Sequence, residues 1–311
     1  MTRPTFFIAG APKCGTTSLY QYLSNHPEIF LPPLDMEPNY FIRDTEMATR
    51  FTKQTEEEYL ALFSEAGSVR HIGERSVSYI YSSEAARRIL AFQPDAKVLI
   101  MLRNPADQIR SLHWNCVRSL NEDVTDLADA LEAESERREG RRLPATAARP
   151  HILQYRQAAS CAGPLEAWLN ILGRDRIHVI VFDEFAQDTA LVHRQVLEFL
   201  GVDHTVAVDH QIHNRGEPAG GIGLRRFLVR HPAIRASLRA LVPGKARAGI
   251  AERLGRMTTQ SRPPMSDDLR RQLLTEFEPQ VEKLESLLGK NLSAWKPASL
   301  PPHPSVSSGP S

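Results

Sequence analysis

The sequence is poor in cysteine, and its three cysteines, Cys14, Cys116 and Cys161, stand at unrelated spacings. An odd number of cysteines at such spacings excludes a disulfide framework and a cysteine-based metal site. No set of His, Cys and Asp residues elsewhere has the spacing of metal ligands. We therefore expect a protein of a reducing compartment that binds no metal ion.

Long apolar segments are also missing. No stretch approaches the roughly 20 apolar residues that a membrane span needs, and no basic and apolar leader precedes the first expected strand. We therefore expect a soluble, cytoplasmic protein without stable membrane insertion. A large charge of one sign is lacking as well: the formal net charge is +1, which argues against nucleic acid as a partner.

The residues that are present have a globular composition, with 41% hydrophobic and 24% charged residues in a chain of 311. Apolar runs alternate with amphipathic segments, which indicates parallel strands joined by helical crossovers. We predict an α/β, P-loop-type three-layer fold with a central parallel sheet flanked by helices, in a single domain over residues 1–297. The Pro/Ser-rich residues 298–311 are expected to form a disordered tail.

The periodicity predicts the individual elements. The expected strands are residues 6–9, 69–74, 96–102 and 176–182, with a short extended piece at 29–31. The expected helices begin at Thr16 and otherwise span residues 55–66, 82–92, 105–119 and 188–200.

A strand–loop–helix segment, FFIAGAPKCGTTSLYQYL over residues 6–23, carries most of the functional information. Gly10 and Gly15 bound its loop, and Thr16, Thr17 and Ser18 stand in the first turn of the expected helix. A helix N-terminus presents unpaired amide N–H groups and so binds anions. The segment therefore predicts a phosphate-binding loop.

The loop differs from that of an ordinary ATPase. The pattern GxxxxGK[ST] is matched at both glycines, but Thr16 stands where the pattern requires Lys, and the only lysine of the loop is Lys13. In an NTPase the Lys contacts the outer phosphates and the next Ser or Thr holds a magnesium ion. The loop thus predicts phosphate binding with a different chemistry.

A second segment, VLIMLRNPADQIRS over residues 98–111, contains a further anion-binding pair. Arg103 follows a buried strand at its carboxyl end, where open α/β sheets bind ligands, and Ser111 lies on the next helix. A guanidinium can give a phosphate two parallel hydrogen bonds, and a hydroxyl adds a third donor. Taken alone, Arg103 is better explained by a surface salt bridge, but together with the first loop an anion-binding role is favoured.

The two segments together resemble those of sulfotransferases that use 3′-phosphoadenosine 5′-phosphosulfate (PAPS). PKCGTTSL, residues 12–19, resembles the 5′-phosphosulfate loop, and Arg103 with Ser111 resembles the 3′-phosphate site. The resemblance implies PAPS as co-substrate and its desulfated form, PAP, as product. It implies that the donor is bound by Lys13, Cys14, Gly15, Thr16, Thr17, Ser18, Arg103 and Ser111.

Further segments resemble the carbohydrate and bacterial branch of this family. EPNYF, residues 37–41, is similar to a KEPxYF element, with Met36 in place of Lys. GERSV, residues 73–77, is similar to GEKSPxY, with Arg75 for Lys and Val77 for Pro. FLGV, residues 199–202, and LLGKNLSAW, residues 287–295, resemble later elements, so that the similarity covers residues 5 to about 296.

The resemblance implies an enzyme that transfers the sulfuryl group in line from PAPS to a hydroxyl of a carbohydrate, glycolipid or secondary metabolite. Glu37 is the implied general base, or else a surface or capping carboxylate, and Lys13 stabilises charge on the leaving phosphate. Arg75 orients the acceptor, neutralises the surroundings of Glu37, or forms a structural ion pair with Glu74 or another acid.

Several alternatives stay open. The cytosolic small-molecule sulfotransferases use a His base, for which His71 and His113 are candidates, although neither lies in a matching segment. A P-loop kinase-like phosphotransferase and a non-catalytic nucleotide-binding module also fit an anion-binding loop. The charged stretch 121–150 is expected to combine an exposed helix with a loop, as a solvated insertion or a lid over the acceptor. The basic residues 224–242 predict an amphipathic helix that packs on the surface or approaches anionic lipid or substrate.

Overall fold

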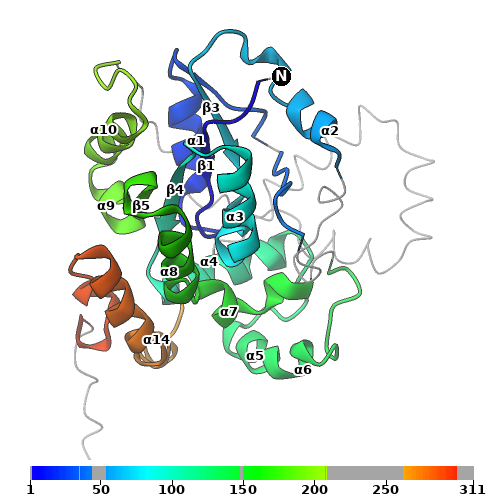
Figure 1. The fold of residues 1–311 in the computed structure, drawn as a ribbon. Coiled ribbons are helices and arrows are strands. Elements are labelled where there is room, and N and C mark those ends of the chain that lie inside the picture. The colour runs from blue at the N-terminus through cyan, green and yellow to red at the C-terminus, as the bar shows by residue number, and fades with distance from the viewer. Residues whose placement is uncertain are drawn as a thin grey trace, which may run out of the picture. The chain divides into compact units, whose positions relative to one another are not determined.

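A computed structural model describes residues 2–34, 36–43, 54–147, 150–206, 208 and 262–299. At its centre lies a five-stranded sheet with the strand order β2-β3-β1-β4-β5, and all the pairings are parallel (Figure 1). The predicted α/β fold with a parallel sheet is therefore confirmed. The strands are β1 Phe6–Ile8, β2 Ile29–Phe30, β3 His71–Arg75, β4 Lys97–Leu102 and β5 Ile177–Val181.

The two central strands are buried on both faces. All three residues of β1 are buried, as are Val98 to Leu102 of β4. Such continuous apolar runs are typical of parallel strands covered by helices on both sides. In the sheet Ile8 lies opposite Arg75 of β3 and Leu99 of β4, so that the carboxyl ends of these strands share one edge.

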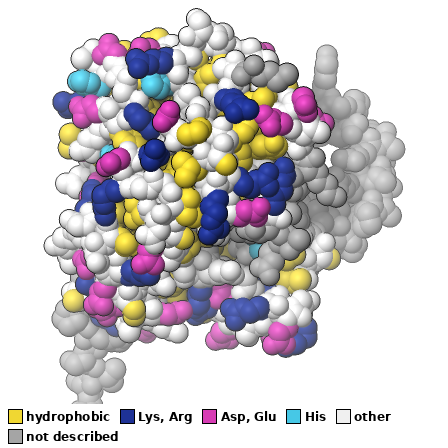
Figure 2. All heavy atoms as spheres, in the orientation of Figure 1, with side chains coloured by type: hydrophobic (Ala, Val, Ile, Leu, Met, Phe, Trp, Pro, Cys, Tyr) yellow, Lys and Arg dark blue, Asp and Glu magenta, His cyan; other side chains and the backbone are white. Residues whose placement is uncertain are grey.

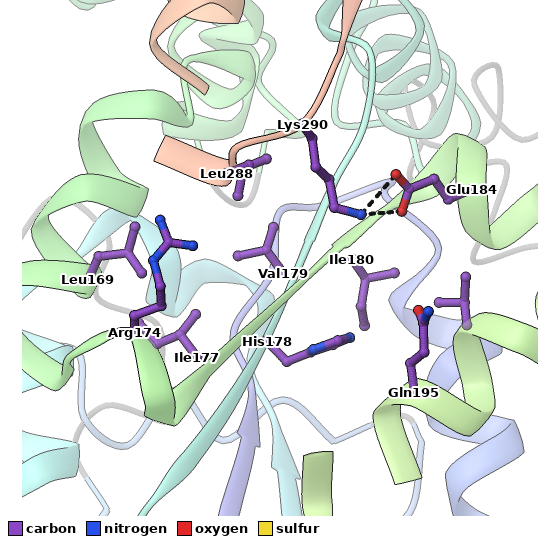
Figure 3. Close-up of a pocket in the computed structure, with 11 residues that line it drawn as sticks. Leu169, Arg174, Ile177, His178, Val179, Ile180, Glu184, Gln195, Leu288 and Lys290 are labelled. Carbon is purple, nitrogen blue, oxygen red and sulfur yellow. Dashed lines mark hydrogen bonds and ion pairs between the residues drawn. The ribbon is translucent and has the colours of Figure 1, made fainter. Parts of the chain in front are cut away.

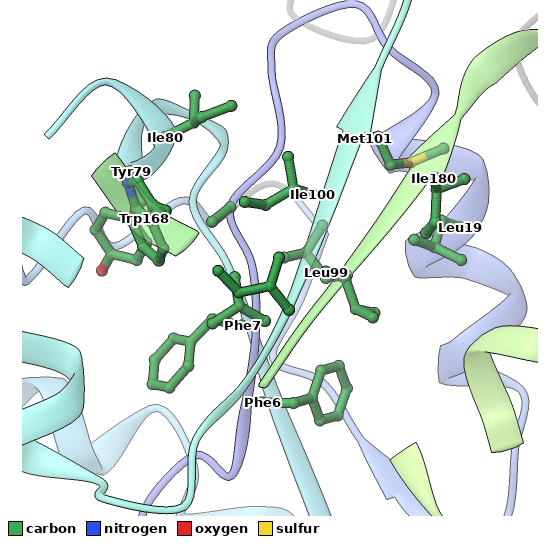
Figure 4. Close-up of a cluster of buried hydrophobic side chains, with 14 of the residues drawn as sticks. Phe6, Phe7, Leu19, Tyr79, Ile80, Leu99, Ile100, Met101, Trp168 and Ile180 are labelled. Atoms are coloured by element: carbon green, nitrogen blue, oxygen red, sulfur yellow. The ribbon is translucent and has the colours of Figure 1, made fainter. Parts of the chain in front are cut away.

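Helices cover both faces of this sheet. In Figure 4, Trp168 of α8 (Ala162–Leu172) lies on the side of Phe7 and Ile100, and Leu19 of α1 (Thr16–Ser24) lies on the side of Met101. Helix α3 (Ser83–Phe92) packs against α8. The other α-helices of the described residues are α2 Glu56–Ala61, α4 Pro105–Arg118, α5 Leu127–Glu132, α6 Glu134–Arg138, α7 Tyr155–Ala159, α9 Phe182–Gln187, α10 Thr189–Leu200 and α14 Asp267–Leu288.

Local capping signals explain several boundaries. Thr55 and Glu58 form the expected capping box at the start of α2. Asp188 caps α10, and Gly201 ends this helix in the left-handed conformation at φ 81°. The helix expected over 55–66 is shorter, since α2 ends at Ala61 and a separate 3₁₀ turn follows at Ser64–Ala66.

The chain divides into two compact units. The first contains the described residues of 1–108, 156–208 and 266–311, and thus the whole sheet. The second contains those of 109–155 and 209–265. The boundary passes through α4, after Gln108. The single domain predicted over 1–297 stays a prediction.

In the second unit, the charged stretch 121–150 differs from the exposed helix that the sequence predicts. It forms the short helices α5 and α6, and Glu122, Glu134 and Arg137 are buried. Nη1 and Nη2 of Arg137 each donate to the Glu122 carboxylate at 2.7 Å, and the Tyr155 hydroxyl donates to the same carboxylate at 2.7 Å. The prediction of solvated charge is wrong for these three residues, and Glu122 and Arg137 are each other's partners.

The helix predicted over residues 224–242 and most of the predicted tail lie outside the described residues. The first two residues of the predicted tail, 298 and 299, complete a 3₁₀ turn that begins at Pro297. Acidic and basic side chains are interspersed on the face in Figure 2, in keeping with the small net charge. No helix in the described part of the chain has the length and apolar character of a membrane span.

Candidate active site

The predicted site residues of the first unit follow the carboxyl ends of neighbouring strands. The loop of residues 10–15 follows β1, Arg75 ends β3, and Arg103 follows β4. Phe182 follows β5, the next strand in the sheet. Because the strands are parallel, these residues lie together at the carboxyl ends of the strands, the edge of the sheet where open α/β folds bind ligands.

The loop leaves β1 pressed against β4. The amide of Ala9 donates to Leu99 O at 2.9 Å, and that of Ala11 donates to Met101 O at 3.1 Å. Between them, a Cβ on Gly10 would lie only 2.1 Å from the Met101 nitrogen. Glycine is therefore required at this position for the close approach of two backbones.

The end of the loop turns into α1 through two left-handed residues. Lys13 has φ 67° and Gly15 has φ 93°, and Gly15 is the N-cap of the helix. The Ser18 amide donates to Gly15 O at 3.0 Å, and no side chain among the described residues caps this end. The first amides of α1 are thus presented at the edge of the sheet, as an anion-binding helix terminus requires.

The side chains of this turn differ in exposure. Cys14 is buried, its thiol donates to Pro12 O at 3.7 Å, and burial raises the pKa of this thiol well above its usual range. Cys14 can therefore serve an anion only through its backbone. Thr16 is 5% exposed, whereas Thr17 and Ser18 are half-buried.

Arg103 contacts the loop directly. Its Nη1 donates to Lys13 O at 3.1 Å, and its guanidinium lies 4.3 Å from the ring centroid of Phe182. Its Nε is buried and has no hydrogen-bond partner among the described residues. A buried donor without an acceptor costs free energy, so this edge of the sheet fits an anionic ligand that supplies one.

Phe182 is a contributor that the sequence analysis missed. Besides contacting Arg103, its ring would lie 2.9 Å from a Cβ on Gly15, so it also packs against the N-cap of α1. The residue stands at the end of the apolar run 176–182. The rule that ligands bind at the carboxyl ends of parallel strands, applied to that run, would have found it.

Ser111 lies on α4 and is 3% exposed, and it belongs to the second unit. Helix α4 begins at the sheet edge: the Asn104 side chain accepts from the Ala106 amide at 3.0 Å, and Pro105 takes the first helical position. The predicted role of Ser111 at the 3′-phosphate stays a prediction.

Glu37 and Arg75 form an ion pair. Arg75 Nη1 lies 2.8 Å from Glu37 Oε1, with the side chains 9% and 26% exposed respectively. Arg75 also donates to Leu34 O at 2.8 Å, and its guanidinium lies 5.8 Å from the ring centroid of Tyr20 on α1. The Glu37 carboxylate is therefore fixed by Arg75 but remains accessible to a small molecule.

Glu74 is not the partner of Arg75. It is fully buried and accepts hydrogen bonds from the hydroxyls of Tyr59 at 2.9 Å, Tyr79 at 3.0 Å and Ser76 at 2.5 Å. Burial raises the pKa of Glu74 to about 7, although the three hydroxyls act in the opposite direction. Of the options that the sequence left open for Arg75, the ion pair is thus made with Glu37.

The two histidines considered as bases occupy other surroundings. His113 belongs to the second unit, its Nε2 lies 2.9 Å from Val124 O, and burial lowers the pKa of its imidazole. His71 is the first residue of β3 and so lies at the amino end of the strand, away from the candidate site at the carboxyl end. Burial lowers the pKa of its imidazole too.

The structure also contains a cavity of about 310 Å³ along β5. In Figure 3 it is bordered by His178 on the strand and by Lys290, which pairs with Glu184 at 2.6 Å. None of the predicted site residues lines it. Among the described residues, no group of three or more His, Cys, Asp or Glu side chains is arranged to hold a metal ion.

Comparison with known proteins identifies the family. The model of the sulfotransferase family matches residues 4–206. The chain belongs to the sulfotransferase family. A solved structure, a sulfotransferase from Alicyclobacillus acidocaldarius, is 30% identical, covers 95% of this chain and 99% of its own, and superposes with a TM-score of 0.70.

Curated relatives match more distantly. Carbohydrate sulfotransferase 15 of Rattus norvegicus is 31% identical over 148 residues, which cover 35% of this chain and 26% of the relative. The human bifunctional heparan sulfate N-deacetylase/N-sulfotransferase 3 is 26% identical over 307 residues, covering 94% of this chain and 31% of the relative. The chain thus spans about a quarter to a third of the length of these relatives.

Family membership agrees with the predicted activity class, the sulfotransferases of the EC 2.8.2 type. It implies PAPS as co-substrate and a small acceptor molecule. The family assignment favours this class over the two alternatives that the sequence left open, a kinase-like phosphotransferase and a non-catalytic module.

Proposed function

We propose that this sulfotransferase transfers the sulfuryl group in line from PAPS to a hydroxyl of a carbohydrate, glycolipid or secondary metabolite. In this proposal Glu37 is the general base, and Lys13 with the first turn of α1 stabilises the leaving phosphate. The observation that carries it is the Glu37–Arg75 ion pair of 2.8 Å, which stands on the same sheet edge as the anion-binding loop.

The donor is assigned to the loop and to Arg103. Lys13, the backbone of Cys14 and Gly15, and the helix start from Thr16 to Ser18 would bind the 5′-phosphosulfate. Arg103 would bind the 3′-phosphate, because its buried Nε lacks a protein acceptor among the described residues and its Nη1 is anchored on Lys13 O. Ser111 is the second ligand implied by the sequence resemblance.

In-line sulfuryl transfer needs two contributions from the protein: a base for the acceptor hydroxyl and positive charge near the leaving phosphate. PAPS supplies the sulfuryl group, and PAP leaves with the electron pair of the broken S–O bond. Glu37 would take the proton of the attacking hydroxyl, and a positioned base contributes about 10² to 10⁴ in rate. Lys13 and the α1 amides would stabilise the charge that develops on the leaving side, where preorganised donors act most strongly.

Arg75 orients the base. Its guanidinium is held by Leu34 O and lies beside the Tyr20 ring, so the carboxylate that it binds has a fixed direction. With its side chain 26% exposed, Glu37 remains accessible to an acceptor. A hydroxyl acceptor is favoured over an amine by the resemblance of residues 37–41 to the carbohydrate branch.

A screen of sugars, glycolipids and hydroxylated natural products with ³⁵S-labelled PAPS would identify the acceptor. With that acceptor, we expect Glu37→Gln to lower kcat by about 10² or more and to leave the dissociation constant of PAP unchanged, because the amide keeps the shape but cannot take the proton. Turnover retained in Glu37→Gln would move the base to another residue, and transfer to amines alone would overturn the hydroxyl assignment.

A further inference from the structure

The buried carboxylate of Glu74 is not used by the proposed mechanism. It is 0% exposed and so cannot touch an acceptor or a donor. It nevertheless stands on β3 next to Arg75, within a cluster of three hydroxyls that all donate to it. Burying an ionisable carboxyl group costs free energy. The hydrogen bonds of this cluster therefore indicate the role of Glu74.

Two of the three hydroxyls also contact the segment that carries Glu37. The Ser76 hydroxyl donates to Glu74 Oε1 and accepts from the Asn39 amide at 2.9 Å. The Tyr79 hydroxyl donates to Glu74 Oε2 and accepts from the Phe41 amide at 3.3 Å. Because each proton points to the carboxylate, each oxygen presents its lone pairs to a backbone amide.

The segment needs such support, because its backbone is unusual. Asn39 has φ 49°, a conformation that residues other than glycine rarely adopt. Its side chain donates to Glu37 O at 3.0 Å, and its carbonyl accepts from the Ile42 amide at 3.1 Å. Fixing the amides of residues 39 and 41 thus fixes the turn from which Glu37 projects.

We propose that Glu74 is a positioning residue for sulfuryl transfer: through Ser76 and Tyr79 it holds the turn of residues 37–41, and so keeps the Glu37 carboxylate where it binds Arg75 and meets the acceptor. This inference rests on the proposed role of Glu37 as base. Glu74 acts on the reaction only through that turn.

The third hydroxyl provides a matched control. Tyr59 donates to the same oxygen, Glu74 Oε2, at 2.9 Å, compared with 3.0 Å for Tyr79. Both tyrosines are fully buried, and both rings pack edge-on against Phe41. Their rings have different neighbours, since Tyr59 also stacks on Tyr40 at 4.2 Å between ring centroids, but a Phe substitution keeps each ring. The hydroxyls differ in that the one of Tyr79 accepts from the Phe41 amide as well as donating to Glu74, whereas the contact of the Tyr59 hydroxyl is with Glu74.

The experiment compares Tyr79→Phe and Ser76→Ala with Tyr59→Phe. Each variant loses one hydrogen bond to Glu74, and Tyr79→Phe and Ser76→Ala also lose the one accepted from a backbone amide, so these two should lose more thermal stability than Tyr59→Phe. We expect Tyr79→Phe and Ser76→Ala to lower kcat about tenfold or more, since a small displacement of a catalytic group has such effects, with the PAP dissociation constant unchanged. Tyr59→Phe should keep kcat within about twofold of wild type. Equal losses of kcat in Tyr59→Phe and Tyr79→Phe would reduce Glu74 to a stabilising residue and overturn the proposal.

A double variant separates this inference from the proposal on which it rests. If the cluster acts through Glu37, adding Tyr79→Phe to Glu37→Gln should cause no further loss of the residual turnover. A further tenfold loss in the double variant would show that the cluster acts elsewhere and would contradict the inference alone. Full turnover in Glu37→Gln itself would instead refute the base assignment.

Discussion

At the scale of single residues, the candidate site is built from short backbone contacts rather than from many charged side chains. Gly10 allows the loop to touch β4, and Arg103 donates to Lys13 O, so the loop and the next strand position each other. A phosphate bound there would meet donors that are already fixed in place, which is how preorganised sites gain strength.

Phe182 offers a test of this arrangement. Phe182→Leu removes the ring 4.3 Å from the Arg103 guanidinium and loosens the packing against Gly15. A cation–π contact is worth about 0.5–2 kcal/mol, so we expect PAP affinity to fall about 2- to 30-fold in calorimetric titration. Phe199→Leu is the control, because its ring lies 5.4 Å from Lys97 at the start of β4. Equal PAP affinity in both variants would exclude a role of Phe182 in donor binding.

Glu74 predicts a dependence of stability on pH. Burial raises its pKa from the ordinary 4.5 to about 7 in the folded protein, so folding is favoured while this carboxyl is protonated. That contribution is fully present below about pH 4.5 and is lost as the pH rises through 7. A shift of this size corresponds to about 3 kcal/mol.

The measurement is urea unfolding of wild type and Glu74→Gln between pH 5 and 8. The amide that replaces the carboxyl in this variant cannot ionise, so wild type should lose free energy of unfolding relative to the variant as the pH rises. A difference between the two proteins that stays constant with pH would refute the assignment of a raised pKa to Glu74.

At the scale of elements, most strands and several helices were predictable, but the regular helices α8 and α14 were not. β4 and α10 were predicted within about a residue at each end, because a continuous apolar run and a Gly stop mark them. Helix α14 was not predicted, although Ser266 caps it and Gly289 ends it, because Pro279 within it is a helix-breaking signal. Its apolar residues still pack at helical spacing, and this tertiary packing outweighs the local signal.

The burial of charged side chains in the second unit could not be predicted from the sequence either. A run such as EAESERREGRR is typical of a solvated face, and only the fold shows that Arg137 and Glu122 are partners. The same limit applies to the candidate site. The loop, Arg103, Glu37 and Arg75 stand in recognisable segments, whereas the contacts of Glu74 with Tyr59 and Tyr79 join residues whose partnership no spacing rule predicts.

The buried pair predicts a large effect on stability. Arg137→Met leaves the Glu122 carboxylate buried without its guanidinium, a change that costs about 3–5 kcal/mol of unfolding free energy. We expect a lower midpoint in thermal unfolding. Arg141→Met, which removes an ion pair whose two side chains are 60% exposed, should change the midpoint little. Similar midpoints for both variants would contradict the role of this pair.

At the scale of the whole molecule, a chain with a formal net charge of +1 is proposed to bind a highly anionic donor. The net charge of the protein provides little long-range attraction for the donor, so the affinity must come from local hydrogen-bond donors and cations: the α1 amides, Lys13 and Arg103. The parallel sheet makes this possible, since loops far apart in the sequence meet at one edge.

The central claim is that Arg103 binds the 3′-phosphate of the donor, and calorimetric titration with two ligands tests it most directly. PAP and adenosine 5′-monophosphate differ only in that phosphate. Arg103→Ala should weaken PAP about 10- to 100-fold more than the monophosphate, the value of hydrogen bonds to a charged group, because both ligands share whatever is lost with the contact to Lys13 O. An equal loss for both ligands, or no loss for PAP, would contradict the account.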